Sequence, residues 1–251
     1  MANPFDLTGR VAVVTGANTG IGRGIAVALA QAGADVALVG RSPAHDTATE
    51  VTVAGRRAVL IDADLSTIAP VERVVSETLE RLGGLDILVN NAGIIRRADA
   101  VEFTEADWDA VIDTNLKSLF FLCQAAGRHM LAQGRGKIVN IASLLSFQGG
   151  IRVPSYAAAK SGVAGLTKAL ANEWAGRGIN VNAIAPGYIA TNTTAALQAD
   201  EIRNRQILER IPAQRWGNPG DLGGAAVFLA ASASDYVNGH ILAVDGGWLA
   251  R

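Results

Sequence analysis

Ser143, Tyr156 and Lys160 are the residues whose types and spacing most directly suggest chemistry. A Tyr and a Lys four positions apart share one face of a helix, so an ammonium group can lie beside a phenol. A nearby positive charge lowers the pKa of a tyrosine from about 10 toward neutrality. Such a tyrosine can protonate a developing alkoxide or deprotonate an alcohol, and we expect the Ser143 hydroxyl to hold the reacting oxygen. The Tyr-x-x-x-Lys spacing alone also occurs by chance on solvated helices.

A glycine-rich turn makes chance a poor explanation. Gly16, Gly20 and Gly22 follow the first apolar run and precede a helical pattern. Glycines in that place allow a tight turn and let backbone amides approach a pyrophosphate at the helix N-terminus. The spacing Gly-x-x-x-Gly-x-Gly differs from the Gly-x-Gly-x-x-Gly fingerprint, so the position between strand and helix carries the prediction of a dinucleotide site. Asn90-Asn91-Ala92-Gly93 is either a set of turn formers or a second wall of the same cleft.

Short apolar runs alternate with longer helical patterns along the whole chain. The runs are nearly continuous in hydrophobicity, which is typical of parallel strands covered on both faces. We predict strands at 11–15, 36–40, 58–62, 87–91, 137–143, 180–186 and 242–245, and helices that include 21–32, 71–82, 116–133, 156–177 and 221–231. Glycines at 33, 83, 134 and 178 mark helix ends. The pattern predicts an α/β fold, a Rossmann-like doubly wound parallel sheet of about seven strands with helices on both faces.

Composition narrows the protein class. The 251 residues show no linker or repeat, so we expect one domain, with a cofactor half at about 1–140 and a catalytic and substrate half at about 141–251. The 22 basic and 23 acidic residues nearly cancel, which argues against nucleic acid and polybasic membrane contacts. No signal-peptide core or membrane-length apolar run is visible, so we expect a cytoplasmic protein. Cys123 lies in an apolar stretch and is expected to be buried, and the three histidines lack ligand-like spacing, so no metal is predicted.

Together these motifs resemble the short-chain dehydrogenase/reductase family over essentially the whole chain. The resemblance implies a catalytic tetrad of Asn115, Ser143, Tyr156 and Lys160, in which Asn115 supports a water-linked proton relay and Lys160 also holds the nicotinamide ribose. It implies that Asp64 contacts the adenine and that Ile189 and Thr191 lie near the carboxamide. The full set of expected cofactor contacts, besides Tyr156 and Lys160, is Gly16, Asn18, Thr19, Gly20, Ile21, Gly22, Arg41, Ser42, Asp64, Leu65, Asn91, Ala92, Gly93, Pro186, Gly187, Ile189 and Thr191.

A narrower resemblance is to an aldonate-type branch of that family, which includes dehydrogenases of gluconate, 2-deoxygluconate and 2-keto-3-deoxygluconate. It is carried by residues 141–156, 210–217 and 235–251. This narrower resemblance implies a sugar-acid substrate. The wider family resemblance implies a homotetramer packed through helices near 116–133 and 156–177, although the apolar stretches of these helices would also fit the core of a monomer. A reductase of an uncharged sugar, polyol or other ketone is the alternative. A non-catalytic dinucleotide sensor is more remote, because it would not need Ser143, Tyr156 and Lys160 together.

Arginines near the predicted cleft and the residues that end the second strand indicate which substrate and which cofactor to expect. A guanidinium can bind a carboxylate through two hydrogen bonds, and Arg96, Arg97 and Arg152 flank the predicted cleft. Arg152 is the preferred anchor and Arg96 the second, while Gln148 is expected to bind a sugar hydroxyl. The second strand ends in Gly40, Arg41 and Ser42 without an acidic residue for a ribose hydroxyl, which favours NADP(H), although the branch is often described with NAD. Arg41 could instead stack on adenine without discriminating.

Overall fold

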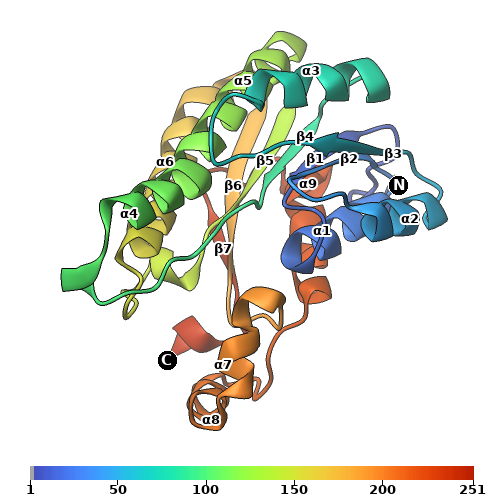
Figure 1. Ribbon diagram of the computed structural model, residues 1–251. Helices are drawn as coiled ribbons and strands as arrows, with labels where there is room; N and C mark the ends of the chain where they lie inside the picture. Colours follow the sequence, from blue (N-terminus) through green and yellow to red (C-terminus); the bar gives the residue numbers. More distant parts are fainter. Residues whose placement is uncertain (1–2) are drawn as a thin grey trace.

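The computed structural model describes residues 3–251 and contains one continuous seven-stranded sheet (Figure 1). The strand order is β3-β2-β1-β4-β5-β6-β7, and all neighbouring pairs are parallel. The strands are β1 Val11–Thr15, β2 Asp35–Gly40, β3 Ala58–Asp62, β4 Ile87–Asn90, β5 Gly136–Ile141, β6 Ile179–Pro186 and β7 Ile241–Val244. The predicted single-domain, doubly wound α/β fold is therefore confirmed.

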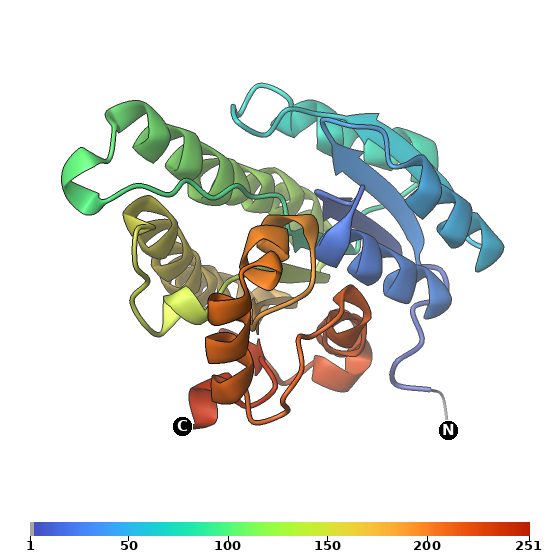
Figure 2. The same ribbon diagram turned by 60° about the horizontal axis from the view of Figure 1, so that its bottom comes forward.

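Two helical layers cover the sheet, and each buries an apolar stripe against it (Figures 1 and 2). One layer consists of α1 (Gly20–Gln31), α2 (His45–Val53) and α9 (Gly223–Ala230). The other consists of α3 (Val71–Leu82), α5 (Ser118–Gln133) and α6 (Pro154–Trp174). Because both faces are covered, β1 is buried along its whole length. Among residues 3–251, no helix is both long and apolar enough to cross a membrane.

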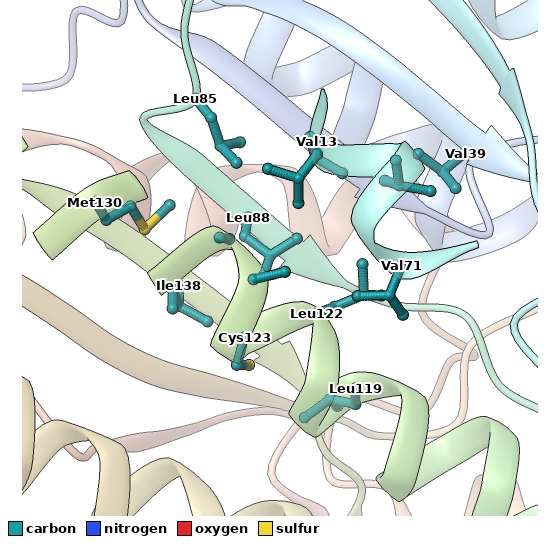
Figure 3. Packing of buried hydrophobic residues seen from close by; sticks show 14 of the residues in the cluster. Val13, Val39, Val71, Leu85, Leu88, Leu119, Leu122, Cys123, Met130 and Ile138 are labelled. Carbon is teal, nitrogen blue, oxygen red and sulfur yellow. The ribbon is translucent and has the colours of Figure 1, made fainter. Parts of the chain in front are cut away.

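Local sequence explains where these elements begin and end. Gly83, Gly134 and Gly178 adopt left-handed backbone directly after a helix, where a side chain would be strained. In the core between the sheet and α5, Leu88 packs against apolar residues of that helix (Figure 3). Cys123 belongs to this core, as predicted, and burial raises the pKa of its thiol to about 12.

Some elements differ from the sequence prediction. Strand β5 ends at Ile141, so Ser143 lies just beyond it in extended backbone, and a π-helical turn, Asp113–Lys117, precedes α5. Helices α2, α4 (Glu105–Ile112), α7 (Ala195–Ala199) and α8 (Glu201–Arg210) were not predicted. The reason is clearest in α8, which is mostly polar and buries only Ile207, so it carries no apolar periodicity.

Candidate active site

Four loops meet at the carboxyl ends of the central strands. The glycine-rich turn follows β1, Asn91–Gly93 follows β4, Ser143 follows β5 and the 187–191 segment follows β6. These strands are neighbours in the order β1-β4-β5-β6. Because parallel strands end at the same edge of a sheet, loops spread over the chain converge there, beside the segment that carries α7 and α8 (Figure 1).

The glycine turn has no room for side chains. Gly16 and Gly20 have φ angles of 63° and 55°. A Cβ atom on Gly22 would lie 2.1 Å from the carbonyl oxygen of Gly16, and one on Gly16 would lie 2.9 Å from Nδ2 of Asn91. Thr15 Oγ1 accepts hydrogen bonds from the amides of Asn91 and Ala92, both at 2.9 Å, which ties the turn to the β4 loop. A cradle of bare backbone at the start of α1 fits the pyrophosphate of a dinucleotide.

Asn90 has a different role from its neighbours, because its side chain is buried between strands. Its Nδ2 donates to Asn140 Oδ1 at 2.9 Å and to Cys123 Sγ at 3.2 Å, and Asn140 Nδ2 donates to Thr167 Oγ1 at 3.0 Å. This network joins β4, β5 and α6 directly beneath the loops. Asn140 and Thr167 were not singled out from the sequence, since a polar residue within an apolar run carries no local signal of its partner.

Tyr156 and Lys160 lie on one face of α6, as the four-residue spacing predicts. Lys160 is buried, its Nζ lies 5.7 Å from the centre of the Tyr156 ring, and it donates to the carbonyl oxygen of Ile141 at 2.6 Å. Burial lowers the pKa of Lys160 to about 8, because the charged form loses its hydration. The ammonium is therefore held beside the phenol by the end of β5.

The pKa of Tyr156 is raised, mainly by burial of the phenol. A side-chain hydrogen bond with Ser143 and the positive charge of Arg97 act in the opposite direction and lower it. The four-residue spacing predicted that Lys160 would lower this pKa. In the structure desolvation outweighs the favourable contacts, and the two groups that oppose it are Ser143 and Arg97. The phenol is thus a proton donor at neutral pH, and Ser143 shares its hydrogen bond.

Asn115 lies in the π-helical turn, and both ends of its side-chain amide are occupied. Its Oδ1 accepts from the amide of Ile94 at 2.8 Å, and its Nδ2 donates to the carbonyl oxygen of Ile94 at 2.9 Å. Asn115 therefore clamps the loop that follows Gly93. Single π-helical turns are frequent at functional sites. The Asn115 side chain would have to release Ile94 before it could take part in a proton relay. Any contribution of Asn115 to such a relay would therefore come from its main-chain groups.

The expected adenosine-side residues lie at the ends of β2 and β3. Arg41 and Ser42 are exposed after β2, and the charge of Arg41 reaches Asp64 after β3. Hydrogen bonds from Ser66, together with Arg41, lower the pKa of the Asp64 carboxyl. Leu65 is buried, and its carbonyl oxygen accepts from Ser118 Oγ at 2.7 Å, which fixes this loop to α5. The loops needed for an adenosine group are therefore close together.

The segment after β6 returns over the glycine turn. Ile189 is buried, and its carbonyl oxygen accepts from Thr194 Oγ1 at 2.7 Å. A Cβ atom on Gly20 would lie 3.3 Å from the Thr191 side chain, so Thr191 lies against the turn. Thr19, Gly20 and Thr191 also line a groove of about 690 Å³, most of which runs along α1. Strand β6 ends at Pro186, directly before this segment.

The structure distinguishes the three arginines named from the sequence. Arg96 pairs with Asp107 at 3.1 Å and Arg152 pairs with Asp99 at 2.9 Å, and both pairs are exposed. Arg97 makes no ion pair or hydrogen bond within residues 3–251, and its charge reaches Tyr156. Because Arg96 and Arg152 already have carboxylate partners, the geometry favours Arg97 as the arginine that is available to a substrate carboxylate within the described residues.

Gln148 and a cluster of aromatic residues complete the site. Gln148 Oε1 accepts from Arg210 Nη2 and from Trp248 Nε1, each at 3.4 Å. Trp248 and Tyr188 pack beside Leu144, the residue after Ser143. Sequence reasoning assigned none of these aromatic residues to the site. The available signal was the position of Tyr188 directly after Pro186-Gly187, at the carboxyl end of a strand.

The chain is similar to known oxidoreductases along nearly its whole length. A family model described as enoyl-(acyl carrier protein) reductase matches residues 16–249. The chain is 59% identical to the 2-dehydro-3-deoxy-D-gluconate 5-dehydrogenase of Escherichia coli K12 over 98% of each chain, and 44% identical to the gluconate 5-dehydrogenase of Gluconobacter oxydans 621H, again over 98% of each.

Solved structures of related proteins have the same fold as this chain. A crystal structure from Agrobacterium tumefaciens with bound NADP, assigned provisionally as a 2-deoxy-D-gluconate 3-dehydrogenase, has 61% identity and a TM-score of 0.95 over 100% of both chains. A gluconate 5-dehydrogenase from Burkholderia cenocepacia in complex with NADP and tartrate has 41% identity and a TM-score of 0.93, covering 99% of this chain and 98% of that one. The chain described here therefore belongs to the short-chain dehydrogenase/reductase family of oxidoreductases.

Proposed function

We propose that this enzyme uses NADP(H) to interconvert a secondary alcohol and a ketone on a sugar acid of the gluconate, 2-deoxygluconate or 2-keto-3-deoxygluconate type. The observation that carries the proposal is the pairing of two features at one sheet edge. One is the Ser143, Tyr156 and Lys160 group, which suits proton transfer to an alkoxide. The other is Arg97, a guanidinium that has no ion-pair partner among residues 3–251 and whose charge reaches that group. The printed names of the relatives point to the same substrate class.

In the reducing direction, residues of this chain donate one proton to the substrate and stabilise the negative charge that remains on the phenolate. Ser143 and the Tyr156 hydroxyl hold the ketone oxygen, and Tyr156 Oη gives up its proton as that oxygen becomes an alkoxide. Lys160, fixed by the Ile141 carbonyl, stabilises the resulting phenolate. Arg97 binds the substrate carboxylate and so orients the chain of hydroxyl groups. The nicotinamide ring, when bound, supplies the hydride, or accepts it in the oxidising direction.

The cofactor residues fit a dinucleotide. Gly16, Gly20 and Gly22 leave room for the pyrophosphate, and Thr191 adjoins them. Arg41 and Ser42 are exposed at the end of β2, where a 2′-phosphate would lie. Relatives crystallised with NADP support the same preference. The proposed cofactor half is about 1–140 and the proposed catalytic and substrate half about 141–251, except that Arg97 of the first half serves the substrate and Thr191 of the second half adjoins the cofactor turn.

The decisive experiment is a turnover screen. Gluconate, 2-deoxygluconate and 2-keto-3-deoxygluconate are offered with NADP⁺ and NAD⁺, the corresponding ketones with the reduced cofactors, and absorbance is followed at 340 nm. A neutral polyol and a neutral ketone serve as controls. We expect sugar acids to be turned over and Tyr156→Phe to lose about 10²–10⁴-fold of the rate while still binding cofactor. Faster turnover of the neutral compounds supports the alternative reductase, and cofactor binding without any turnover supports a dinucleotide sensor.

We also infer a cytoplasmic homotetramer. Family resemblance supports the tetramer, as does an outward face of α6 that presents small exposed residues, including Ala158, Ser161 and Gly165, which let a helix of another subunit approach closely. Light scattering on the purified protein measures the mass in solution. A monomer at micromolar concentration would contradict the inference.

A further inference from the structure

Three segments that are distant in the sequence meet at one side chain. Gln148 belongs to the loop between Ser143 and α6, which we call the catalytic loop (144–153). Arg210 ends α8, in the segment of residues 192–210 that we call the α7–α8 segment. Trp248 lies in the C-terminal turn, Trp248–Ala250, and Figure 2 shows the C-terminus beside α8. Gln148 Oε1 accepts a hydrogen bond from each of the other two residues, both at 3.4 Å.

The C-terminal turn is fastened to the end of α8 by several contacts. The Arg210 guanidinium stacks 4.0 Å from the centre of a Trp248 ring. Arg251 Nε donates to the carbonyl oxygen of Arg210 at 3.1 Å, and Arg251 Nη2 donates to that of Glu209. Those carbonyls are among the last of the helix and lack partners within it, so a cationic side chain satisfies them. The turn and α8 therefore behave as one unit.

One small apolar cluster joins that unit to the rest of the molecule, and Asn204 of α8 also accepts a hydrogen bond from Trp216 Nε1 at 2.7 Å. Ile207 is the one residue of α8 that is buried, and it packs with Ile211, Trp248 and Leu144. Leu144 directly follows Ser143, and Thr191, just before the α7–α8 segment, lies against Gly20. The segment thus spans from the cofactor turn to the catalytic loop. A region with few buried contacts opens at low free energy, so one additional polar link changes how often it opens.

We propose that Gln148 is a positioning residue that holds the α7–α8 segment and the C-terminal turn against the catalytic loop, and thereby sets the apparent affinity for substrate. This role rests on the proposed function, in which the substrate lies beneath that segment. It differs from direct binding of a sugar hydroxyl by Gln148, because the Oε1 atom is already shared by Arg210 and Trp248.

The first test compares Gln148→Leu, Arg210→Met and the double variant, with the oxidised substrate and NADPH. Loss of a neutral hydrogen-bond acceptor corresponds to about a 2- to 10-fold change. We expect each single variant to raise KM for the sugar acid by that factor, with kcat and the NADPH dissociation constant nearly unchanged. The double variant should lose less than the product of the two single effects, because the Gln148–Arg210 hydrogen bond is removed in both; Gln148→Leu also removes the Trp248 bond, and Arg210→Met also removes the stacking on Trp248. Fully additive losses would overturn the proposal in favour of independent roles, with Gln148 in direct contact with substrate.

The second test needs no substrate, so it separates this proposal from the proposed function. Amide hydrogen exchange of residues 201–210 is measured on the enzyme saturated with NADPH. Gln148→Leu should speed exchange there, whereas Gln148→Glu, which keeps an acceptor for both donors, should restore the wild-type rate. Unchanged exchange in Gln148→Leu overturns the proposal even if sugar acids are turned over. Faster exchange with rescue supports the link even if every sugar acid proves inert, an outcome that refutes the proposed function alone.

Discussion

Replacing Arg97 by methionine removes the guanidinium that has no carboxylate partner among the described residues and whose charge reaches Tyr156. Methionine keeps an unbranched chain of similar reach, so the change is chiefly one of charge. Arg96→Met and Arg152→Met are matched controls, because each removes a neighbouring arginine that is already paired, with Asp107 and Asp99 respectively. Arg152 was the preferred carboxylate anchor from sequence alone, so the comparison also tests that prediction.

The magnitude follows from the exposure of Arg97. Hydrogen bonds to charged groups contribute about 1.5–3 kcal/mol. Arg97 is exposed, so solvent screening places it near the lower end of that range. At 1.4 kcal/mol per factor of ten, kcat/KM for a sugar acid should fall about 10- to 30-fold. The same variant should raise the pKa of Tyr156, because a charge that lowers this pKa has been removed.

The assay measures kcat/KM for a sugar acid and for a neutral ketone of similar size, across pH. Circular dichroism and NADPH affinity establish that each variant is folded. We expect Arg97→Met to affect the acid far more than the neutral ketone, and both controls to lose less than about 3-fold, as exposed ion pairs do. Equal losses for both substrates would show that Arg97 acts on the phenol and not on a carboxylate. A full effect from Arg152→Met with none from Arg97→Met would refute the reasoning from ion pairing.

Three further predictions concern the cofactor, the buried lysine and the glycine turn. Arg41→Ala should lower kcat/KM for NADPH by about 10-fold or more and leave NADH nearly unchanged, since Arg41 would face the 2′-phosphate; equal losses would refute that contact. The pKa of Lys160 is lowered from 10.5 to about 8 in the folded enzyme. Between pH 8 and 10.5 the unfolded chain therefore keeps a proton on Lys160 that the folded chain has lost, so the folded state becomes relatively more stable as the pH rises through this range. From pH 7 to 10.5, the free energy of urea unfolding of the wild type should therefore rise by up to about 3 kcal/mol relative to that of Lys160→Met. A difference between the two proteins that does not change with pH would contradict the burial argument. Gly22→Ala should abolish cofactor binding and lower the melting temperature, because its Cβ would lie 2.1 Å from the Gly16 oxygen, whereas Gly224→Ala, with open space around it, should do neither.

Local sequence was sufficient to predict several strands and helices of the fold and the pairing of Tyr156 with Lys160. Strands β1 and β3 and helix α3 have the predicted bounds, because continuous apolar runs and an amphipathic stripe with a glycine cap are local signals. The Tyr156 and Lys160 spacing likewise predicts a shared helix face. By contrast, α8 was missed, because a helix with one buried residue lacks the periodicity that marks an amphipathic helix.

The pKa of Tyr156 and the ion pairing of the nearby arginines depend on the tertiary structure and could not be predicted from the sequence. Spacing suggested that Lys160 would lower the pKa of Tyr156, but burial of the phenol dominates and raises it. The sequence ranked Arg152 first and Arg96 second as carboxylate anchors, and only the fold shows that both are already paired, with Asp99 and Asp107 respectively. Residue type and spacing along a helix are local properties. Desolvation and ion pairing depend on which distant segments the sheet order brings together, and therefore appear only in the folded chain.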